Sequence, residues 1–291
     1  MPLLRYLNLH RFQYLSLVPA LFLIFMVSFY PLGYTIYLSF FEGGLARLKY
    51  VGIGNYAWLL EDDFFWESAR ISVVYCCFTV GLTLVASLGM GILLAQPERG
   101  NQVFKYIAIL PWIVSAVVAG ILWKWILSAE FGAMNEALLM FGLERVNWLG
   151  RPNSAMTMII AGGVWKTLPF TALLFYAAVL SLPQEIYESA LTDGAGPLQR
   201  FARLTLPLLR PAILVVLVIL TINFFNELTM PLTITNGGPS RATTALPLYM
   251  WRVAFRYTRL GLGSVIALVL FVVNIGLAIG YIKLIKAENV Y

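Results

Sequence analysis

The stretch SLPQEIYESALTDGAGPLQRFARLTLPLLR, residues 181–210, separates two long apolar runs and differs from both of them. Apolar residues recur at helical spacing before and after Gly194-Ala195-Gly196-Pro197, with charged and amide side chains on the opposite faces. Pro207 and Pro211 mark the turn into the next apolar run. The stretch predicts two short amphipathic helices joined by a glycine break, which is more structure than a helix–helix connector of about 2–8 residues needs.

The sequence around this stretch has the composition of a membrane protein. Hydrophobic residues make up 60% of the 291 residues, charged residues only 12%, and the mean hydropathy is +0.81. Soluble domains carry about 25% charged residues, and a helix needs about 20 apolar residues to cross a bilayer. The uncharged runs predict an all-α polytopic membrane protein with six transmembrane helices, at residues 12–41, 71–97, 106–127, 156–180, 211–233 and 260–282.

The distribution of basic residues predicts the topology. Arg and Lys are equally numerous on the two sides of a six-span chain, but on the side of the termini they lie in shorter loops near helix ends. The positive-inside rule gives such loops the most weight, so we expect both termini in the cytoplasm. We divide the chain into residues 1–70 (N-terminal segment, first transmembrane helix and first outer loop), residues 71–285 (transmembrane domain with the loop 181–210) and a short tail, residues 286–291.

Several classes of function are disfavoured. The net charge of +6 comes from basic residues scattered over short loops, without the basic stripe of a nucleic-acid-binding protein. The adjacent pair Cys76-Cys77 has no metal-binding or disulfide spacing, and the single histidine, His10, argues against histidine-based catalysis. The sequence also lacks the Gly-x-x-x-x-Gly-Lys-Ser/Thr loop that binds nucleotide phosphates. We therefore expect no catalytic residue, no metal site, no cofactor and no nucleic-acid partner.

Residues 188–207 resemble the cytoplasmic signature of ABC importer permeases, which reads Glu-Ala-Ala, three residues, Gly, nine residues, Ile-x-Leu-Pro. Here the residues 188–190, Gly194 and the string 204–207 stand at the same spacings. In that family the segment is a coupling helix that docks into a groove of a separate ATPase, so the resemblance implies this role and a type I ABC importer permease fold. The alternative is an amphipathic helix that lies on the lipid headgroups. The residues assigned to coupling are Glu188, Ser189, Ala190, Asp193, Gly194, Ala195, Gly196, Leu206 and Pro207.

Further strings resemble the sugar-importing branch of that family, in particular its maltose-type first permease. They cover nearly the whole chain and read YPLGY (30–34), VGIGNY (51–56), LPW (110–112), WKW (123–125), VWKTLPF (164–170) and LTITNGGP (232–239). The large outer insertion of the maltose permease itself is missing from this sequence. We therefore expect a less extensive contact with a binding protein.

The resemblance implies an assembly and a substrate. The assembly is a heterotetramer of this chain, a second homologous permease and two ATPase subunits that bind ATP and Mg²⁺, served by an extracytoplasmic solute-binding protein. The chain would cross the bilayer of a bacterial or archaeal cell membrane and form half of the pathway for a sugar, expected to be a di- or oligosaccharide. Import of glycerol 3-phosphate or a sugar alcohol is one alternative. A secondary transporter is another, although the sequence shows no convincing inverted repeat.

Polar residues inside the predicted spans are candidates for the pathway, because a charge at the bilayer centre costs about 2.5–3.5 kcal/mol on insertion scales. The spacing of Asn223, Asn226 and Glu227 predicts that they share one helix face. By resemblance, the positions that match sugar-contacting positions of the maltose permease are Trp112, Lys166, Thr167 and Glu227, although the residue types differ at the last three. The full set assigned to the pathway is Trp112, Trp165, Lys166, Thr167, Asn223, Asn226 and Glu227.

The two charged members of this set, Lys166 and Glu227, allow two interpretations. As substrate ligands their charges sum to zero, which favours a neutral sugar over an anionic phosphate ester. As a buried ion pair they would be structural, and removal of either one would leave the other charge unpaired.

A basic face outside the predicted pathway also has two interpretations. Arg252, Arg256 and Arg259 are predicted to lie on one face of an outer helix. Their partner would be solvent and lipid headgroups, or an acidic lobe of a binding protein.

Overall fold

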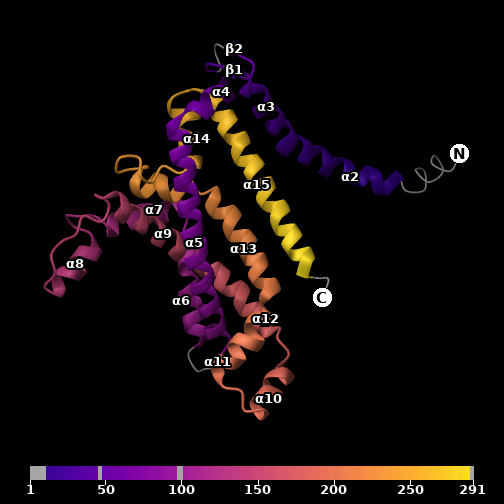
Figure 1. Ribbon diagram of the computed structural model, residues 1–291, viewed down its shortest axis with the longest axis vertical. Coiled ribbons are helices and arrows are strands. Elements are labelled where there is room, and N and C mark those ends of the chain that lie inside the picture. Colours follow the sequence, from indigo (N-terminus) through magenta and orange to yellow (C-terminus); the bar gives the residue numbers. More distant parts are fainter. Residues whose placement is uncertain (1–10, 45–47, 97–100, 289–291) are drawn as a thin grey trace. The chain divides into compact units, whose positions relative to one another are not determined.

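The computed structural model describes residues 11–44, 48–96 and 101–288, and most of them are helical (Figure 1). Within these ranges, four continuous helical stretches are long and apolar enough to cross a membrane, namely Ser16–Ser39, Asp63–Ala95, Pro152–Leu180 and Leu260–Leu284. Two bent helix pairs have the same composition. Counting each bent pair as one span gives six spans, which is the number that the sequence predicts.

Helices dominate the described part of the chain, and the π-helical turns are marked η. The helical elements are α2 (Arg11–Ile24), η1 (Phe25–Phe29), α3 (Tyr30–Ser39), α4 (Gly54–Glu61), α5 (Asp63–Ala95), α6 (Asn101–Ile113), α7 (Ala116–Ile126), α8 (Ala133–Met140), α9 (Pro152–Leu180), α10 (Gln184–Thr192), α11 (Pro197–Arg200), η2 (Phe201–Thr205), α12 (Leu206–Leu208), α13 (Arg210–Phe225), η3 (Pro231–Thr235), α14 (Leu246–Trp251), η4 (Arg252–Arg256) and α15 (Leu260–Glu288). Two short strands, β1 (Phe41–Glu42) and β2 (Lys49–Tyr50), pair antiparallel.

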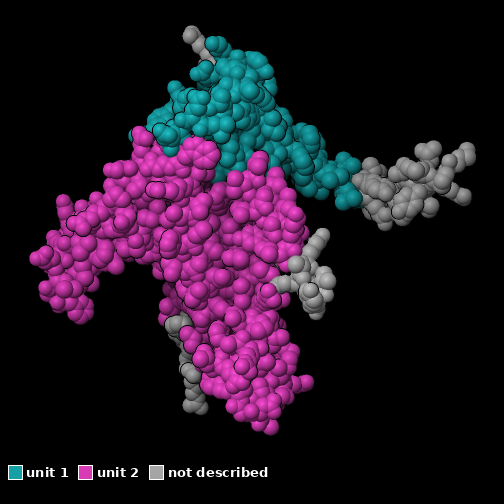
Figure 2. All heavy atoms as spheres, viewed as in Figure 1, with its two compact units in different colours: residues 1–63, 250–271 teal, residues 64–249, 272–291 magenta. Residues whose placement is uncertain are grey.

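The chain divides into two compact units (Figure 2). The first comprises residues 1–63 and 250–271. In this unit the buried side chain of Asn55 fastens the connection between α3 and α4, because its amide donates to the carbonyl oxygens of Ser39 at 2.9 Å and Phe41 at 2.8 Å. The VGIGNY string therefore has a structural role, which is to satisfy backbone carbonyls where the first span ends.

The second unit comprises residues 64–249 and 272–291, and its long helices pack closely through glycines. A Cβ on Gly91 of α5 would lie 2.9 Å from the Ala172 carbonyl oxygen of α9. A Cβ on Gly163 of α9 would lie 2.9 Å from the hydroxyl oxygen of Tyr75 on α5. Small residues at such contacts let helix backbones approach each other within a membrane. Figure 1 shows α10, α11 and α12 together at one end of this unit.

The third span is broken, which corrects the prediction of one helix over residues 106–127. Helices α6 and α7 meet at an angle of 100°. Pro111 in the last turn of α6 has no backbone N–H to donate, and Ser115 has an extended backbone, with ψ 141°, immediately before α7 begins. The sequence shows the proline that weakens the helix, but it does not show the angle between the two helices.

The fifth span is also shorter than predicted. Helix α13 ends at Phe225 and not near residue 233, because Asn226 leaves the helical conformation and its side-chain amide donates to the Ile222 carbonyl oxygen at 2.7 Å. A separate helical stretch follows, which includes η3. At its other end, α13 meets the α11–α12 stretch at 66°.

Candidate functional site

The coupling segment, residues 181–210, folds as two helical arms around a glycine turn, in agreement with the predicted pattern. The first arm, α10, ends in a Schellman motif. The amide of Gly194 donates to the Leu191 carbonyl oxygen at 3.0 Å, and the amide of Ala195 donates to the Ala190 carbonyl oxygen at 2.9 Å. Gly194 has φ +76°, in the left-handed region that glycine adopts without steric cost. This glycine therefore sets the direction in which the chain leaves α10.

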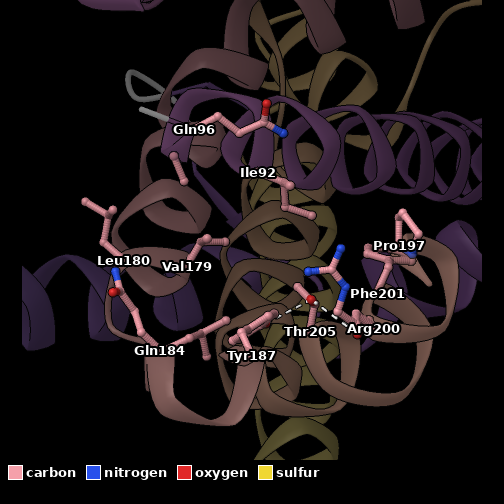
Figure 3. A pocket seen from close by; sticks show the side chains of 12 residues that line it. Ile92, Gln96, Val179, Leu180, Gln184, Tyr187, Pro197, Arg200, Phe201 and Thr205 are labelled. Atoms are coloured by element: carbon pink, nitrogen blue, oxygen red, sulfur yellow. Dashed lines mark hydrogen bonds between the residues drawn. The ribbon is translucent and has the colours of Figure 1, made fainter. Parts of the chain in front are cut away.

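A hydrogen bond joins the two arms of the coupling segment. The hydroxyl of Tyr187 on α10 donates to Thr205 Oγ1 in η2 at 2.9 Å, and this oxygen in turn donates to the Arg200 carbonyl oxygen at 3.5 Å (Figure 3). Thr205 is 8% exposed, so the bond between the arms is partly shielded from water. The two arms are held as one body, which is what a segment must be to transmit a displacement.

The outer surface of the coupling segment is available for a partner. Of the residues assigned to coupling, Ala190 and Ala195 are half-buried, and those that are exposed are Glu188, Ser189, Asp193, Gly194, Gly196, Leu206 and Pro207. Large apolar side chains are exposed beside them, at Ile186, Leu191 and Leu198, the last with 79% of its surface open. An amphipathic helix with exposed apolar residues is the kind of element that binds in a groove of another protein.

Trp112 and Lys166 are brought together at the break in the third span. The Trp112 ring, 47% exposed, stacks on Phe170 of α9, with ring centroids 5.2 Å apart and an interplanar angle of 17°. The ammonium of Lys166 donates to the Trp112 carbonyl oxygen at 2.7 Å. Because α6 ends at Ile113, this carbonyl belongs to a helix C-terminus, where a cation is stabilised. Lys166 therefore holds the end of α6 against α9.

Asn223, Asn226 and Glu227 do not all lie in one helix, and the prediction is wrong in that respect. Asn223 lies in α13, Asn226 is the C-cap of that helix, and Glu227 follows it. Asn226 exchanges amide hydrogen bonds with Asn274 of α15, 3.0 Å in each direction. The end of the helix at Phe225 is the physical reason for the error.

Lys166 and Glu227 form no direct salt bridge in the part of the chain that the structure describes, but their charges still interact at longer range, so the ion-pair interpretation is wrong for a direct contact only. The Oε1 atom of Glu227 instead accepts a hydrogen bond of 3.0 Å from the amide of Met230. This amide lies in the first turn of the helical stretch that includes η3, where a carboxylate is stabilised by free N–H groups. Each charge thus faces a helix terminus of the opposite polarity.

The remaining pathway residues are neutral, and their side chains form fewer hydrogen bonds. Trp165 meets Trp123 of α7 edge-on, with centroids 6.0 Å apart. Among the described residues, the hydroxyl of Thr167, the side-chain amide of Asn223 and the indole N–H of Trp112 have no hydrogen-bond partner. The indole N–H of Trp165 is likewise without a hydrogen-bond partner among the described residues.

Sequence reasoning missed several contacts at the site. Phe170 lies four residues after Lys166, so helical spacing was a usable signal for it. Asn274 is a lone amide side chain in an apolar span, and such a residue is a candidate for a polar contact within the membrane. The bond between Tyr187 and Thr205 had no signal, because it depends on how two arms fold back on each other.

The basic face predicted for the outer helix is interrupted. Arg252 and Arg256 lie in η4, but Arg259 follows the end of that helix. The guanidinium carbon of Arg259 stands 5.9 Å from the centroid of the Trp58 ring, a cation–π contact within one unit. The prediction of three aligned arginines is therefore wrong for Arg259.

No group of three or more His, Cys, Asp or Glu side chains in the described ranges is arranged to hold a metal ion. Cys76 and Cys77 are both free, the first buried and the second exposed. That ATP, Mg²⁺ and any other cofactor bind to partner subunits only stays a prediction.

Comparison with known proteins gives consistent matches over most of the chain. Residues 87–284 match the family described as "Binding-protein-dependent transport system inner membrane component". The sulfoquinovosyl glycerol transport system permease protein SmoG of Agrobacterium fabrum is 32% identical, over 94% of this chain and 90% of the relative. The trehalose/maltose transport system permease protein MalF of Thermococcus litoralis is 33% identical, over 94% and 93%.

Two further comparisons concern another substrate and the fold. The sn-glycerol-3-phosphate transport system permease protein UgpA of Yersinia enterocolitica is 30% identical, over 96% of this chain and 95% of the relative. A chain of a bacterial ABC transporter involved in the import of the acidic polysaccharide alginate superposes with a TM-score of 0.86, over 99% of both chains, at 20% identity. At that identity the superposition establishes the fold, which is the type I permease fold expected from the sequence.

Proposed function

Because the chain belongs to the family of binding-protein-dependent transport system inner membrane components, we propose that it is one permease subunit of an ATP-driven importer for sugars. Its relatives SmoG and MalF are named for sulfoquinovosyl glycerol and for trehalose/maltose. We take a di- or oligosaccharide as the substrate, and this chain as one half of its pathway.

The chemistry of the unengaged pathway side chains carries the sugar assignment. Three of the neutral groups without a hydrogen-bond partner among the described residues are the indole N–H of Trp112, the hydroxyl of Thr167 and the side-chain amide of Asn223. The Trp112 ring is also partly exposed. Sugars combine apolar ring faces, which stack on aromatic rings, with hydroxyl groups, which both donate and accept hydrogen bonds. Lys166 and Glu227 contribute by holding the broken helices in place.

The coupling segment is proposed to bind a separate ATPase. Its exposed apolar residues would seat in a groove of that subunit, and the bond between Tyr187 and Thr205 would carry the displacement of α10 to α12 and α13. This chain would then supply no catalytic residue, and ATP with Mg²⁺ would be bound by the ATPase.

The assembly is proposed to contain two permeases and two ATPases. The second permease would be homologous to this chain, and a solute-binding protein would deliver the sugar from outside the cell. The chain is a multi-pass membrane protein. We place both termini and the coupling segment on the cytoplasmic side of a bacterial or archaeal cell membrane.

Transport by the reconstituted complex tests this function. The chain is co-expressed with the permease, ATPase and solute-binding protein encoded beside it, and the complex is placed in proteoliposomes containing ATP. Uptake and ATPase stimulation are measured with maltose, trehalose and sn-glycerol 3-phosphate. We expect stimulation by at least one disaccharide and loss of uptake without ATP. Uptake that continues without ATP would refute the importer.

Glycerol 3-phosphate is the second candidate substrate, because UgpA matches almost the whole chain at 30% identity. Stimulation by sn-glycerol 3-phosphate alone would establish this candidate and overturn the sugar assignment. The same experiment therefore decides between the two substrates.

A further inference from the structure

A cavity of about 630 Å³ lies between the coupling segment and the ends of two spans (Figure 3). Its walls come from the last turn of α5, the last turn of α9 and the two arms of the coupling segment, all within one compact unit. Its volume falls in the range of about 300–1,000 Å³ that is usual for small-molecule sites. The cavity therefore has room for a ligand that reaches it at the level where the spans end.

The lining of this cavity is mostly apolar, and its polar groups come from Gln96, Gln184, Tyr187, Arg200 and Thr205. Ile92, Val179, Leu182 and Phe201 represent the apolar walls. Arg200 is the one charged residue among the twelve described residues that line the cavity. Such a lining suits a ligand with an anionic group and an attached hydrocarbon chain.

The guanidinium of Arg200 has no hydrogen-bond or ion-pair partner among the residues that the structure describes. Its Nε atom is buried without a hydrogen bond, and no carboxylate in the described ranges pairs with it. Figure 3 shows the group turned into the cavity, between Ile92 and Thr205. Buried donors are normally satisfied, so an unpaired one beside a cavity indicates that something else supplies the acceptor.

We propose that this cavity binds one anionic phospholipid from the adjacent leaflet, with its phosphate on Arg200 and an acyl chain along the apolar walls. The position supports this, because the cavity lies where the apolar helices α5 and α9 end, which is the level at which lipid headgroups are expected. Charge supports it as well, because arginine binds phosphate through several N–H groups at once. The lipid would fill the space behind the coupling segment and support the α10–η2 bond from that side.

A carboxylate of the ATPase is the competing partner for Arg200. The position of the side chain disfavours it, because Arg200 is half-buried and directed inward, whereas the exposed acidic residues Glu188 and Asp193 lie on the surface of the segment. The two partners make different predictions for the same variants.

Lipid retention by the assembled complex tests the proposal. The complex is placed in nanodiscs of phosphatidylcholine with a minor share of phosphatidylglycerol, delipidated mildly, and examined by native mass spectrometry. Arg200→Gln removes the proposed phosphate ligand. The matched control is Arg203→Gln, which removes the same charge from an exposed residue three positions away that does not line the cavity.

We expect the parent complex and Arg203→Gln to retain one phosphatidylglycerol, and Arg200→Gln to retain about tenfold less, the loss of one charge-assisted contact. Arg200→Lys should keep part of the retention. Equal retention by both glutamine variants would overturn the proposal. So would loss of ATPase from the Arg200→Gln complex with its lipid unchanged, which would identify the ATPase as the partner. Displacement of the lipid by millimolar inorganic phosphate would also overturn it, in favour of a free-phosphate site.

Discussion

The turn at Gly194 allows backbone strain to be tested separately from side-chain crowding. Gly194 has φ +76°, whereas Gly196 has φ −68° and ψ 165°, an extended conformation that any residue adopts. A Cβ on either glycine meets no atom within 4 Å. The two positions therefore differ in backbone conformation and not in the space for a side chain.

Serine at the two positions should have opposite consequences. At Gly194 it must adopt a left-handed conformation, which costs about 1–2 kcal/mol. A penalty of that size lowers the ratio of the native turn to its alternatives by about 5–30-fold. Gly196 is the N-cap of α11, where serine is among the favoured residues. We therefore expect Gly194→Ser to lower the amount of sugar transported per ATP by about 5-fold or more, and Gly196→Ser to behave like the parent.

The assay is uptake and ATP hydrolysis measured on the same proteoliposomes, with co-purification of the ATPase as the measure of assembly. Gly194→Asn provides the rescue, because asparagine tolerates the left-handed region better than serine does. The reasoning is refuted if the two serine variants have equal transport per ATP. It is also refuted if Gly194→Asn is more impaired than Gly194→Ser.

Three further predictions concern the site. Lys166→Met and Glu227→Gln remove contacts to two different helix termini, each worth about 1.5–3 kcal/mol before its partial exposure is discounted. Their effects on thermal stability should therefore add within about 0.5 kcal/mol. Recovery of thermal stability in the double variant would contradict this expectation. Tyr187→Phe should cost about 0.5–1.5 kcal/mol and lower transport per ATP without loss of assembly, with no further loss when Thr205→Val is added. Trp112→Ala should raise the KM for the sugar about 2–10-fold, whereas Trp112→Phe should change it little; equal KM values would exclude ring stacking.

The number and type of the elements could be predicted because they follow from local sequence. Six apolar runs predict six spans, and amphipathic spacing on either side of Gly194 predicts two arms. The ends of the helices could be predicted less well from the sequence. Helix α5 begins at Asp63, eight residues before the uncharged run used to predict it, because its first turns carry charges. A count of uncharged residues finds the hydrocarbon crossing and not the whole helix.

The break between α6 and α7 and the end of α13 could not be predicted from hydropathy. Residues 106–127 are uniformly apolar apart from Lys124, so their composition is that of a straight span. At the 100° bend the Trp112 carbonyl oxygen accepts a hydrogen bond from Lys166, and that donor comes from another helix. In the same way the end of α13 is set by Asn226 and by its partner Asn274, which lies 48 residues away in sequence. Contacts of this kind are tertiary and leave no local pattern.

The same two breaks change how the charges within the membrane should be interpreted. The formal charges of Lys166 and Glu227 sum to zero, and the sequence favours a neutral sugar only through that sum. In the structure neither charge is free to be added, because one is bound to the C-terminus of α6 and the other lies at the start of the stretch containing η3. A broken helix exposes backbone groups that the bilayer does not solvate, and a side chain of the opposite polarity at each end supplies the missing partner. The neutral solute that we propose is therefore supported by a different set of groups, namely the exposed indole N–H of Trp112, the hydroxyl of Thr167 and the side-chain amide of Asn223, which have no hydrogen-bond partner among the described residues.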